Sequence, residues 1–170
     1  MLELVSSSKG AILAVEPVEL TGVPPGYSAP RKVLRYVFTH RESGKRTRID
    51  FWHSASDPTA VELGFHCFKD VFAGAAPQAF RFAEADVKRR GFARIVAKRR
   101  QSDCLSFLMH MGYWFASEAK FVAFTKRLRS RLPGAPKLEF SARRAVASAV
   151  FKASRSLHKL PQTTLVKRLQ

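Results

Sequence analysis

Four ionisable residues between positions 50 and 88 are of the types needed to hydrolyse a phosphodiester bond. Asp50 lies in the run TRIDFWH, and Glu84, Asp86 and Lys88 alternate in the run AEADVK. Carboxylates can hold a divalent metal ion, and a neighbouring ammonium group can stabilise the negative charge that develops during hydrolysis. If the fold brings Asp50 next to Asp86, these residues predict a catalytic metal site.

The order of these residues resembles that of restriction-like nucleases, in which an aspartate on a strand precedes an acid-x-lysine pair. The resemblance implies that Asp50 and Asp86 hold the metal, that Glu84 assists and that Lys88 stabilises developing charge. It covers only a few residues of the chain. A metal-dependent nuclease is therefore an alternative function and not the first prediction.

The histidines and cysteines do not have the spacing of a zinc site. His53, His66, Cys67, Cys104 and His110 match no strong zinc-binding pattern. Adjacent residues on a helix also point in different directions, which separates His66 from Cys67. We therefore expect packing or surface roles for these side chains and no bound cofactor.

Positive charge is the strongest chemical signal in the sequence. The 170 residues include 30 Lys and Arg against 13 Asp and Glu, a net charge of +17. Residues 1–85 carry 10 basic and nine acidic residues, whereas residues 86–170 carry 20 and four. Because so much like charge repels itself, an anionic partner is expected, and the asymmetry places its surface in the second half.

Three basic segments of the second half, residues 88–100, 125–131 and 142–160, contain no acid. A solvated helical face normally mixes signs, because opposite charges four residues apart stabilise a helix. Nucleic acid is the simplest polyanion to propose, since Lys and Arg on several elements can follow its backbone. The residues predicted to make these contacts are Arg89, Arg90, Arg94, Lys98, Arg99, Arg100, Lys126, Arg127, Arg129, Arg131, Arg144, Phe151, Lys152 and Arg155.

Phe151 is the one aromatic residue in this set. On a helix it projects from the cationic side, between Arg144, Lys152 and Arg155. A nucleic-acid base can stack on an aromatic ring in such a place. The alternative is that Phe151 packs against another element of the fold.

These observations predict a non-catalytic protein that binds DNA or RNA, or a subunit of a nucleoprotein complex with further protein partners. They do not determine whether the ligand is DNA or RNA, whether it is single-stranded or double-stranded, or whether the protein prefers a particular sequence. A second alternative is a module that binds a membrane surface or an acidic protein. It follows from the final helix, which has one cationic and one apolar face.

A cytoplasmic location is expected. No basic region followed by an apolar stretch opens the chain, and two cysteines are too few for a disulfide framework. The longest apolar run, residues 104–116, is shorter than the ~20 residues that a bilayer requires. We therefore expect no transmembrane segment.

Residues 1–75 are expected to form a β-rich scaffold with one covering helix. Aliphatic and β-branched residues predict a strand in 10–22, and two alternating runs around a polar loop predict a β-hairpin over 32–53. A helix is predicted over 57–73, because Asp57 can cap it and apolar residues repeat at helical spacing.

Residues 76–160 are expected to form a basic, mainly helical region of the same domain, followed by a tail from 161 to 170. Within this region, 86–101 fits either a helix or a hairpin. A long helix is predicted from about 103 to 131, with Gly112 as a place where it can be interrupted, and a last one over 141–160. The predicted fold class is α+β: an N-terminal antiparallel sheet or hairpin packed by a helix, then a basic helical half.

Overall fold

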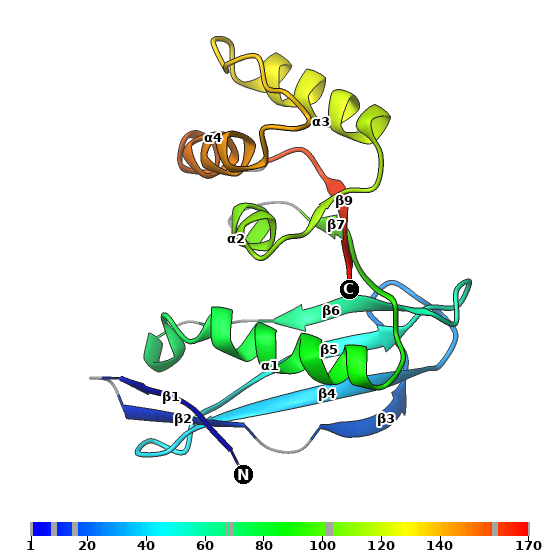
Figure 1. Cartoon of the computed structure of the whole chain (residues 1–170), viewed down its shortest axis with the longest axis vertical. Helices are drawn as coiled ribbons and strands as arrows, with labels where there is room; N and C mark the ends of the chain where they lie inside the picture. The colour runs from blue at the N-terminus through cyan, green and yellow to red at the C-terminus, as the bar shows by residue number, and fades with distance from the viewer. Residues whose placement is uncertain are drawn as a thin grey trace. The chain divides into compact units, whose positions relative to one another are not determined.

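The computed structural model belongs to the α+β class, as predicted, with strands dominating the N-terminal half and helices the C-terminal half (Figure 1). It forms two compact units. Unit 1 contains residues 1–95 and 168–170, and unit 2 contains residues 96–167. The residues that the structure describes are 2–7, 10–14, 17–66, 68, 70–100, 104–157 and 160–169.

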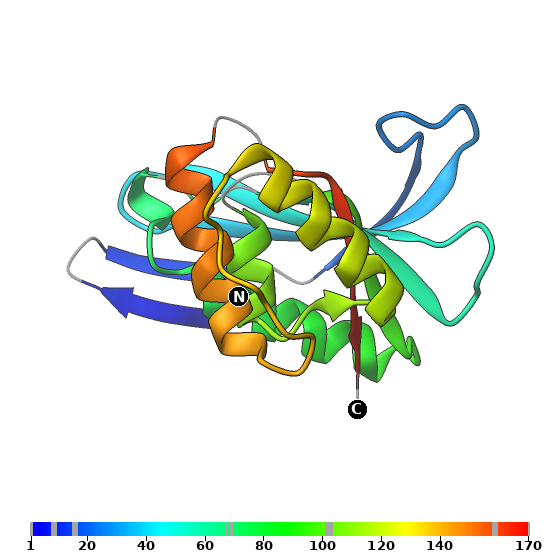
Figure 2. The same ribbon diagram turned by 90° about the horizontal axis from the view of Figure 1, so that it is seen from above.

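Unit 1 is built on an antiparallel sheet with the strand order β1-β2-β4-β5-β6, and β3 also pairs with β4. β2 pairs with the last residues of β4 and β3 with its first ones, so they lie at opposite ends of β4 (Figure 2). β4 and β5 confirm the predicted hairpin. The strands are β1 (Leu2–Ser7), β2 (Gly10–Ala14), β3 (Val18–Gly22), β4 (Arg31–His40), β5 (Arg46–His53) and β6 (Ala60–His66).

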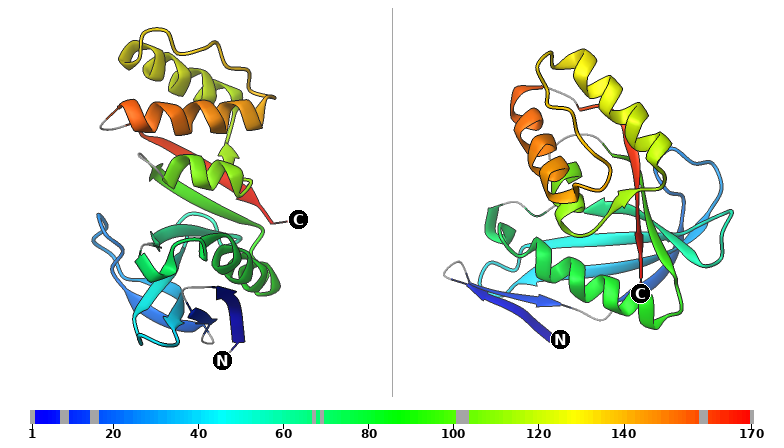
Figure 3. Two further views of the ribbon diagram at one scale, coloured as in Figure 1. Left: turned by 90° about the vertical axis from the view of Figure 1, so that its left-hand side faces the viewer. Right: turned by 45° about the horizontal axis from the view of Figure 1, so that its top comes forward.

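Helix α1 (Ala76–Arg89) covers one face of this sheet (Figure 3). Its buried side chains include Phe80 and Val87. On the sheet, alternate residues of β4 point toward the helix and are fully buried, among them Tyr36 and Phe38. Burial of these apolar side chains is the main source of stability for unit 1.

The prediction of a helix over residues 57–73 is wrong. This segment forms β6 and then a short 3-10 helix, η1 (Asp70–Phe72), and α1 takes the covering role. Residues 61–63 alternate Val, Glu and Leu, and β5 offers an edge with which such a run can pair. Here pairing with β5 overrides the apolar repeat at helical spacing.

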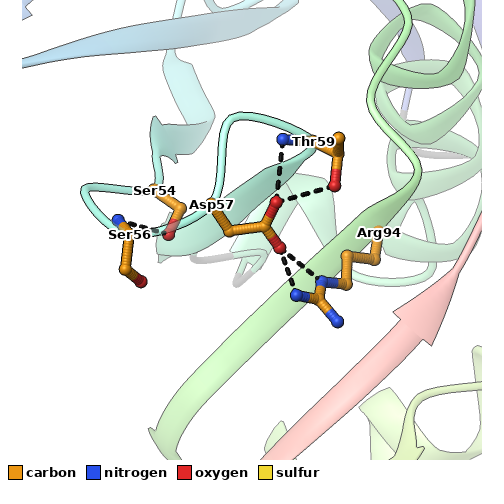
Figure 4. Close-up of polar contacts among 5 residues, drawn as sticks. All are labelled: Ser54, Ser56, Asp57, Thr59 and Arg94. Atoms are coloured by element: carbon orange, nitrogen blue, oxygen red, sulfur yellow. Dashed lines mark hydrogen bonds and ion pairs between the residues drawn. The ribbon is translucent and has the colours of Figure 1, made fainter.

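Asp57 holds a turn instead of capping a helix (Figure 4). Its Oδ1 accepts hydrogen bonds from the backbone N–H of Thr59, at 2.9 Å, and from the Thr59 hydroxyl, at 2.7 Å. Its Oδ2 accepts from the guanidinium group of Arg94, with Nε at 2.8 Å. The Thr59 hydrogen bonds, followed by the contact with Arg94, lower the pKa of the Asp57 carboxyl.

Gly64 on β6 gives Trp52 of β5 the room that its indole ring occupies. A Cβ atom at position 64 would overlap Nε1 of this ring, whereas one at Gly22 would lie 3.5 Å from its Cη2. We expect Gly64→Ala to lower the free energy of unfolding by about 1–3 kcal/mol, because this overlap outweighs the ~0.5–1 kcal/mol that alanine gains over glycine in a strand. Urea denaturation of Gly64→Ala and the control Gly22→Ala measures this, and equal stability of the two variants would contradict it.

Unit 2 combines three helices with a small sheet in which β9 lies between β7 and β8. β8 and β9 pair antiparallel. α4 lies between α2 and α3 (Figure 3). The Ser106 hydroxyl on α2 donates to the carbonyl oxygen of Ala147 on α4 at 3.1 Å. The elements are β7 (Arg94–Arg100), which begins in unit 1, α2 (Cys104–His110), β8 (Trp114–Phe115), α3 (Glu118–Arg131), α4 (Arg143–Ser156) and β9 (Thr163–Arg168).

Glycines follow the ends of helices in two of the predicted segments, one of them at the interruption expected at Gly112. At Gly91 the backbone has φ 88°, and α1 has ended before it, so residues 86–101 form a helix end, a turn and the strand β7. At Gly112, with φ 89°, the long helix predicted to 131 is broken into α2 and α3. Glycine adopts such left-handed conformations at little cost, which explains both breaks. Residues 101–103, where the long helix was expected to start, lie outside the described residues.

The last predicted helix and the tail also differ from expectation. α4 begins at Arg143 without a side-chain cap from Ser141 and ends at Ser156, because Leu157 is extended. The segment predicted as a tail contains β9. Among the described helices, none has the length and apolar character to cross a bilayer.

Candidate nucleic-acid interface

Three of the predicted phosphate-binding arginines already have carboxylate partners. Arg89 and Arg90 both contact Asp86, with Arg90 Nε 2.7 Å from Oδ2, and Arg94 contacts Asp57 (Figure 4). All three pairs lie in unit 1. A phosphate that binds these arginines, as predicted, would therefore have to compete with an internal carboxylate.

Asp86 is the centre of the first of these networks. It is only 5% exposed, and it also accepts a hydrogen bond from the buried hydroxyl of Tyr36 at 2.8 Å. Burial acts to raise the pKa of the Asp86 carboxyl, but hydrogen bonds from Arg90, Tyr36 and Arg89 outweigh it and hold this pKa below its usual value. Burial and the same hydrogen bond raise the pKa of Tyr36, so its hydroxyl stays protonated and donates.

The aspartates of the nuclease pattern are not brought together. Asp50 pairs with Arg35, Nε to Oδ1 at 2.9 Å, and with Arg48 at 3.2 Å. Tyr36, the residue after Arg35 on β4, donates instead to Asp86. Successive side chains of a strand point to opposite faces, so Asp50 and Asp86 lie on opposite faces of the sheet and cannot share a metal ion.

Metal-ligating side chains are dispersed elsewhere as well. Within the ranges that the structure describes, no three His, Cys, Asp or Glu residues are grouped to hold a metal ion. Cys104 is half-buried and forms no disulfide within the described residues, and His110 Nδ1 lies 2.8 Å from the carbonyl oxygen of Ser106. The alternative of a metal-dependent nuclease therefore has no assembled site among these residues.

The positive charge is concentrated in unit 2. Its residues, 96–167, include 15 Lys and Arg against three Asp and Glu, a net charge of +12. The remaining residues of the chain have 15 basic and 10 acidic residues, a net charge of +5. Unit 2 therefore carries the candidate interface.

Helix α4 presents a cationic stripe with an aromatic residue inside it. Arg144, Ser148, Phe151 and Arg155 follow one another at intervals of four, three and four residues, which places them on one side of a helix. All four are exposed, and Phe151 is 52% exposed. We call these four residues the α4 stripe.

The opposite side of α4 anchors the helix in the core of unit 2. Val146, Ala147, Val150 and Ala153 are all at most 2% exposed. Because the apolar side faces inward, the α4 stripe faces solvent. The exposure of Phe151 agrees with the predicted orientation and not with packing inside the core.

Several further predicted cations are exposed on α3 and around it. Lys126 and Arg129 line a hollow of about 750 Å³ beside Thr125, Ser130 and Gly134. In the part of the chain that the structure describes, no carboxylate forms an ion pair with the following predicted residues: Lys126, Arg129, Arg144, Lys152 and Arg155.

The other predicted residues are less available or not placed. Arg127 donates to the carbonyl oxygens of Ala123, at 3.3 Å, and Gln162, at 3.1 Å, so it has a structural role. Lys98 and Arg131 are exposed. The side chains of Arg99 and Arg100 lie outside the described residues.

Arg143 and Lys137 are two of the five Lys and Arg residues of unit 2 that the predicted set omits. The guanidinium group of Arg143 lies over the ring of Trp114, with its carbon 5.3 Å from the ring centroid. Trp114 belongs to an aromatic cluster with Phe121 and Phe140. Lys137 lies exposed in the connection between α3 and α4. Arg143 was in an acid-free segment and could have been included, whereas Lys137, two residues from Glu139, carried no such signal.

Comparisons of the chain with models of known families, with curated proteins and with solved structures found no match.

Proposed function

We propose that unit 2 binds nucleic acid without catalysis, as a binding protein or as a subunit of a nucleoprotein complex. The observation that carries the proposal is the α4 stripe, in which two arginines that pair with no carboxylate of the described residues flank an exposed phenylalanine. Guanidinium groups bind phosphate through forked hydrogen bonds, and an aromatic ring between them offers a base a surface for stacking. The predicted cytoplasmic location stays a prediction.

The distances along α4 suit a nucleic-acid backbone. At 1.5 Å per residue, Phe151 lies roughly 10 Å along the helix axis from Arg144 and roughly 6 Å from Arg155. Lys126 and Arg129 on α3 are further exposed cations of the same unit. A chain of phosphates can meet such dispersed charges, whereas a single small anion meets only one or two of them.

An anionic membrane is a weaker candidate for this surface. Binding in the plane of a bilayer requires an apolar face that can enter the lipid. The apolar face of α4 is already buried in the core of unit 2. The helix therefore offers lipid only its charged side and Phe151.

Salt dependence tests the proposed function. The intact protein is titrated with labelled single-stranded and double-stranded DNA and RNA of equal length at several salt concentrations. Release of counterions predicts that log affinity falls linearly with log salt, by about 0.7–0.9 for each phosphate neutralised. Affinity that is independent of salt for all four oligonucleotides would contradict the proposal.

Replacing Phe151 by alanine separates stacking from charge. We expect Phe151→Ala to lower affinity for single strands by about 5–150-fold, because stacking contributes roughly 1–3 kcal/mol per base. The slope of log affinity against log salt should stay unchanged, since no charge is removed. Fluorescence anisotropy measures both quantities. Ser148→Ala is the matched control on the same stripe, and an equal loss in the two variants would exclude stacking on Phe151.

A further inference from the structure

A groove of about 600 Å³ runs along a second side of α4, between this helix, the end of α3 and the connection formed by residues 132–138. Its floor includes Leu128 and Ala153, which are buried. Half-buried side chains, among them Leu132 and Leu138, form its walls. The groove is therefore apolar and lies entirely within unit 2.

This groove adjoins the α4 stripe, and Ser148 lines both. Its other lining residues on α4 include Ala145, Ala149, Lys152 and Ser156, which lie roughly 100–160° around the helix axis from Phe151. From Ala145 to Ser156 it extends for roughly 16 Å, or about three helical turns. A rod-like ligand of that length can lie in it while nucleic acid occupies the stripe.

The charges at the groove are all of one sign. Lys137 and Lys152 are exposed, and no Asp or Glu is among its lining residues. Small side chains such as Ala145 and Ala149 let the backbone of a ligand approach α4 closely. These features match the mode in which an amphipathic helix lays its apolar face into a groove.

We infer that this groove binds an acidic amphipathic helix of a partner protein. The apolar face of that helix fills the space above Leu128 and Ala153, and its carboxylates meet Lys137 and Lys152. Charge complementarity decides the occupant: a second copy of this chain would bring a unit with 15 Lys and Arg against three Asp and Glu. Like charges facing each other would oppose such a contact.

The test uses two labelled 16-residue peptides and the intact protein. One has Leu and Ala at helical spacing on one face and Glu elsewhere; in the other, every Leu is replaced by Ser, so the charge is the same. We expect the leucine peptide to bind at least about tenfold more tightly, because only it buries apolar surface in the groove. Equal affinity of the two peptides would show attraction by charge alone and would overturn the inference.

Ala149→Trp fills the groove and should weaken binding of the leucine peptide at least about tenfold, because the side chain occupies the space of the ligand. Binding of a single-stranded oligonucleotide should change less than about twofold, since the α4 stripe is intact. Unchanged peptide affinity in a folded variant would overturn the inference.

Lys137→Glu provides a second test that leaves the core untouched, because Lys137 is exposed in a connection. It places a carboxylate at the edge of the groove and should lower the affinity for the leucine peptide at least about threefold, because like charges repel. If Ala149→Trp does not fold, this variant decides the question, and undiminished binding of the peptide overturns the inference. The oligonucleotide measurements distinguish this outcome from failure of the proposed nucleic-acid function.

Discussion

Reversing the two arginines of the α4 stripe, Arg144→Glu with Arg155→Glu, should lower affinity for nucleic acid more than any other change considered. Each arginine that contacts a phosphate contributes about one unit to the slope of log affinity against log salt. The slope of the double variant should therefore be smaller in magnitude by about two units. At moderate salt we expect a loss of affinity of about 30-fold or more, because each reversal removes an attraction and adds a repulsion. Anisotropy titrations over a range of salt concentrations measure both effects.

The control must change the net charge equally at residues outside the proposed interface. Lys45→Glu with Arg46→Glu does so, because both residues are exposed in unit 1, at the turn between β4 and β5, and neither belongs to the α4 stripe. The control changes the net charge but no proposed contact with nucleic acid, so it should alter affinity only a few-fold. A control as damaging as the stripe variant would mean that net charge, and not the stripe, governs binding.

Asp86→Ala should have the largest effect on the stability of unit 1, about 2–3 kcal/mol. The substitution leaves the fully buried hydroxyl of Tyr36 without its acceptor and removes a carboxylate that accepts from Arg89 and Arg90. The loss stays below that of a fully buried ion pair, because the Arg89 side chain is 79% exposed and water can solvate it. Chemical denaturation gives the difference in the free energy of unfolding.

The effect of Asp86→Ala should also depend on pH. Since the pKa of Asp86 is lower in the folded protein than in the unfolded chain, its ionised form adds stability above the unfolded value, near 4. That contribution is lost as pH falls through the folded pKa. The gap between wild type and variant should therefore be full at pH 7 and shrink in acid. The control is Glu19→Ala, which removes an exposed ion pair with Lys32 and should lower the free energy of unfolding by less than about 0.5 kcal/mol. A difference in stability between wild type and Asp86→Ala that does not change with pH would contradict the role assigned to the Asp86 carboxylate.

The sequence predicts correctly those features that depend on the spacing of residues close together along the chain. The β4–β5 hairpin follows from alternation on both sides of a polar loop, and the exposure of Phe151 follows from the helical period of α4. The pairing of Asp86 with Arg90 is also local, four residues along a helix, and could have been recognised. The pairing of Arg94 with Asp57 spans 37 residues and depends on how β7 begins beside the turn before β6.

The helix wrongly predicted over residues 57–73 depends instead on contacts between distant parts of the chain. Val61, Phe65, Phe68 and Phe72 have helical spacing, but the same segment alternates at 61–63, and only the presence of β5 decides between them. Likewise, the sequence could place Asp50 on a strand and Asp86 on a helix. It could not show that they lie on opposite faces of the sheet, because that depends on which side of the sheet α1 covers.

The position of β9 has a consequence for biosynthesis. β7 and β8 are made early, but the strand that lies between them is contributed by residues 163–168, after α3 and α4 have been translated. Until then both strands have unpaired edges that can recruit other chains. A ribosome therefore has to deliver nearly the whole of unit 2 before this sheet closes.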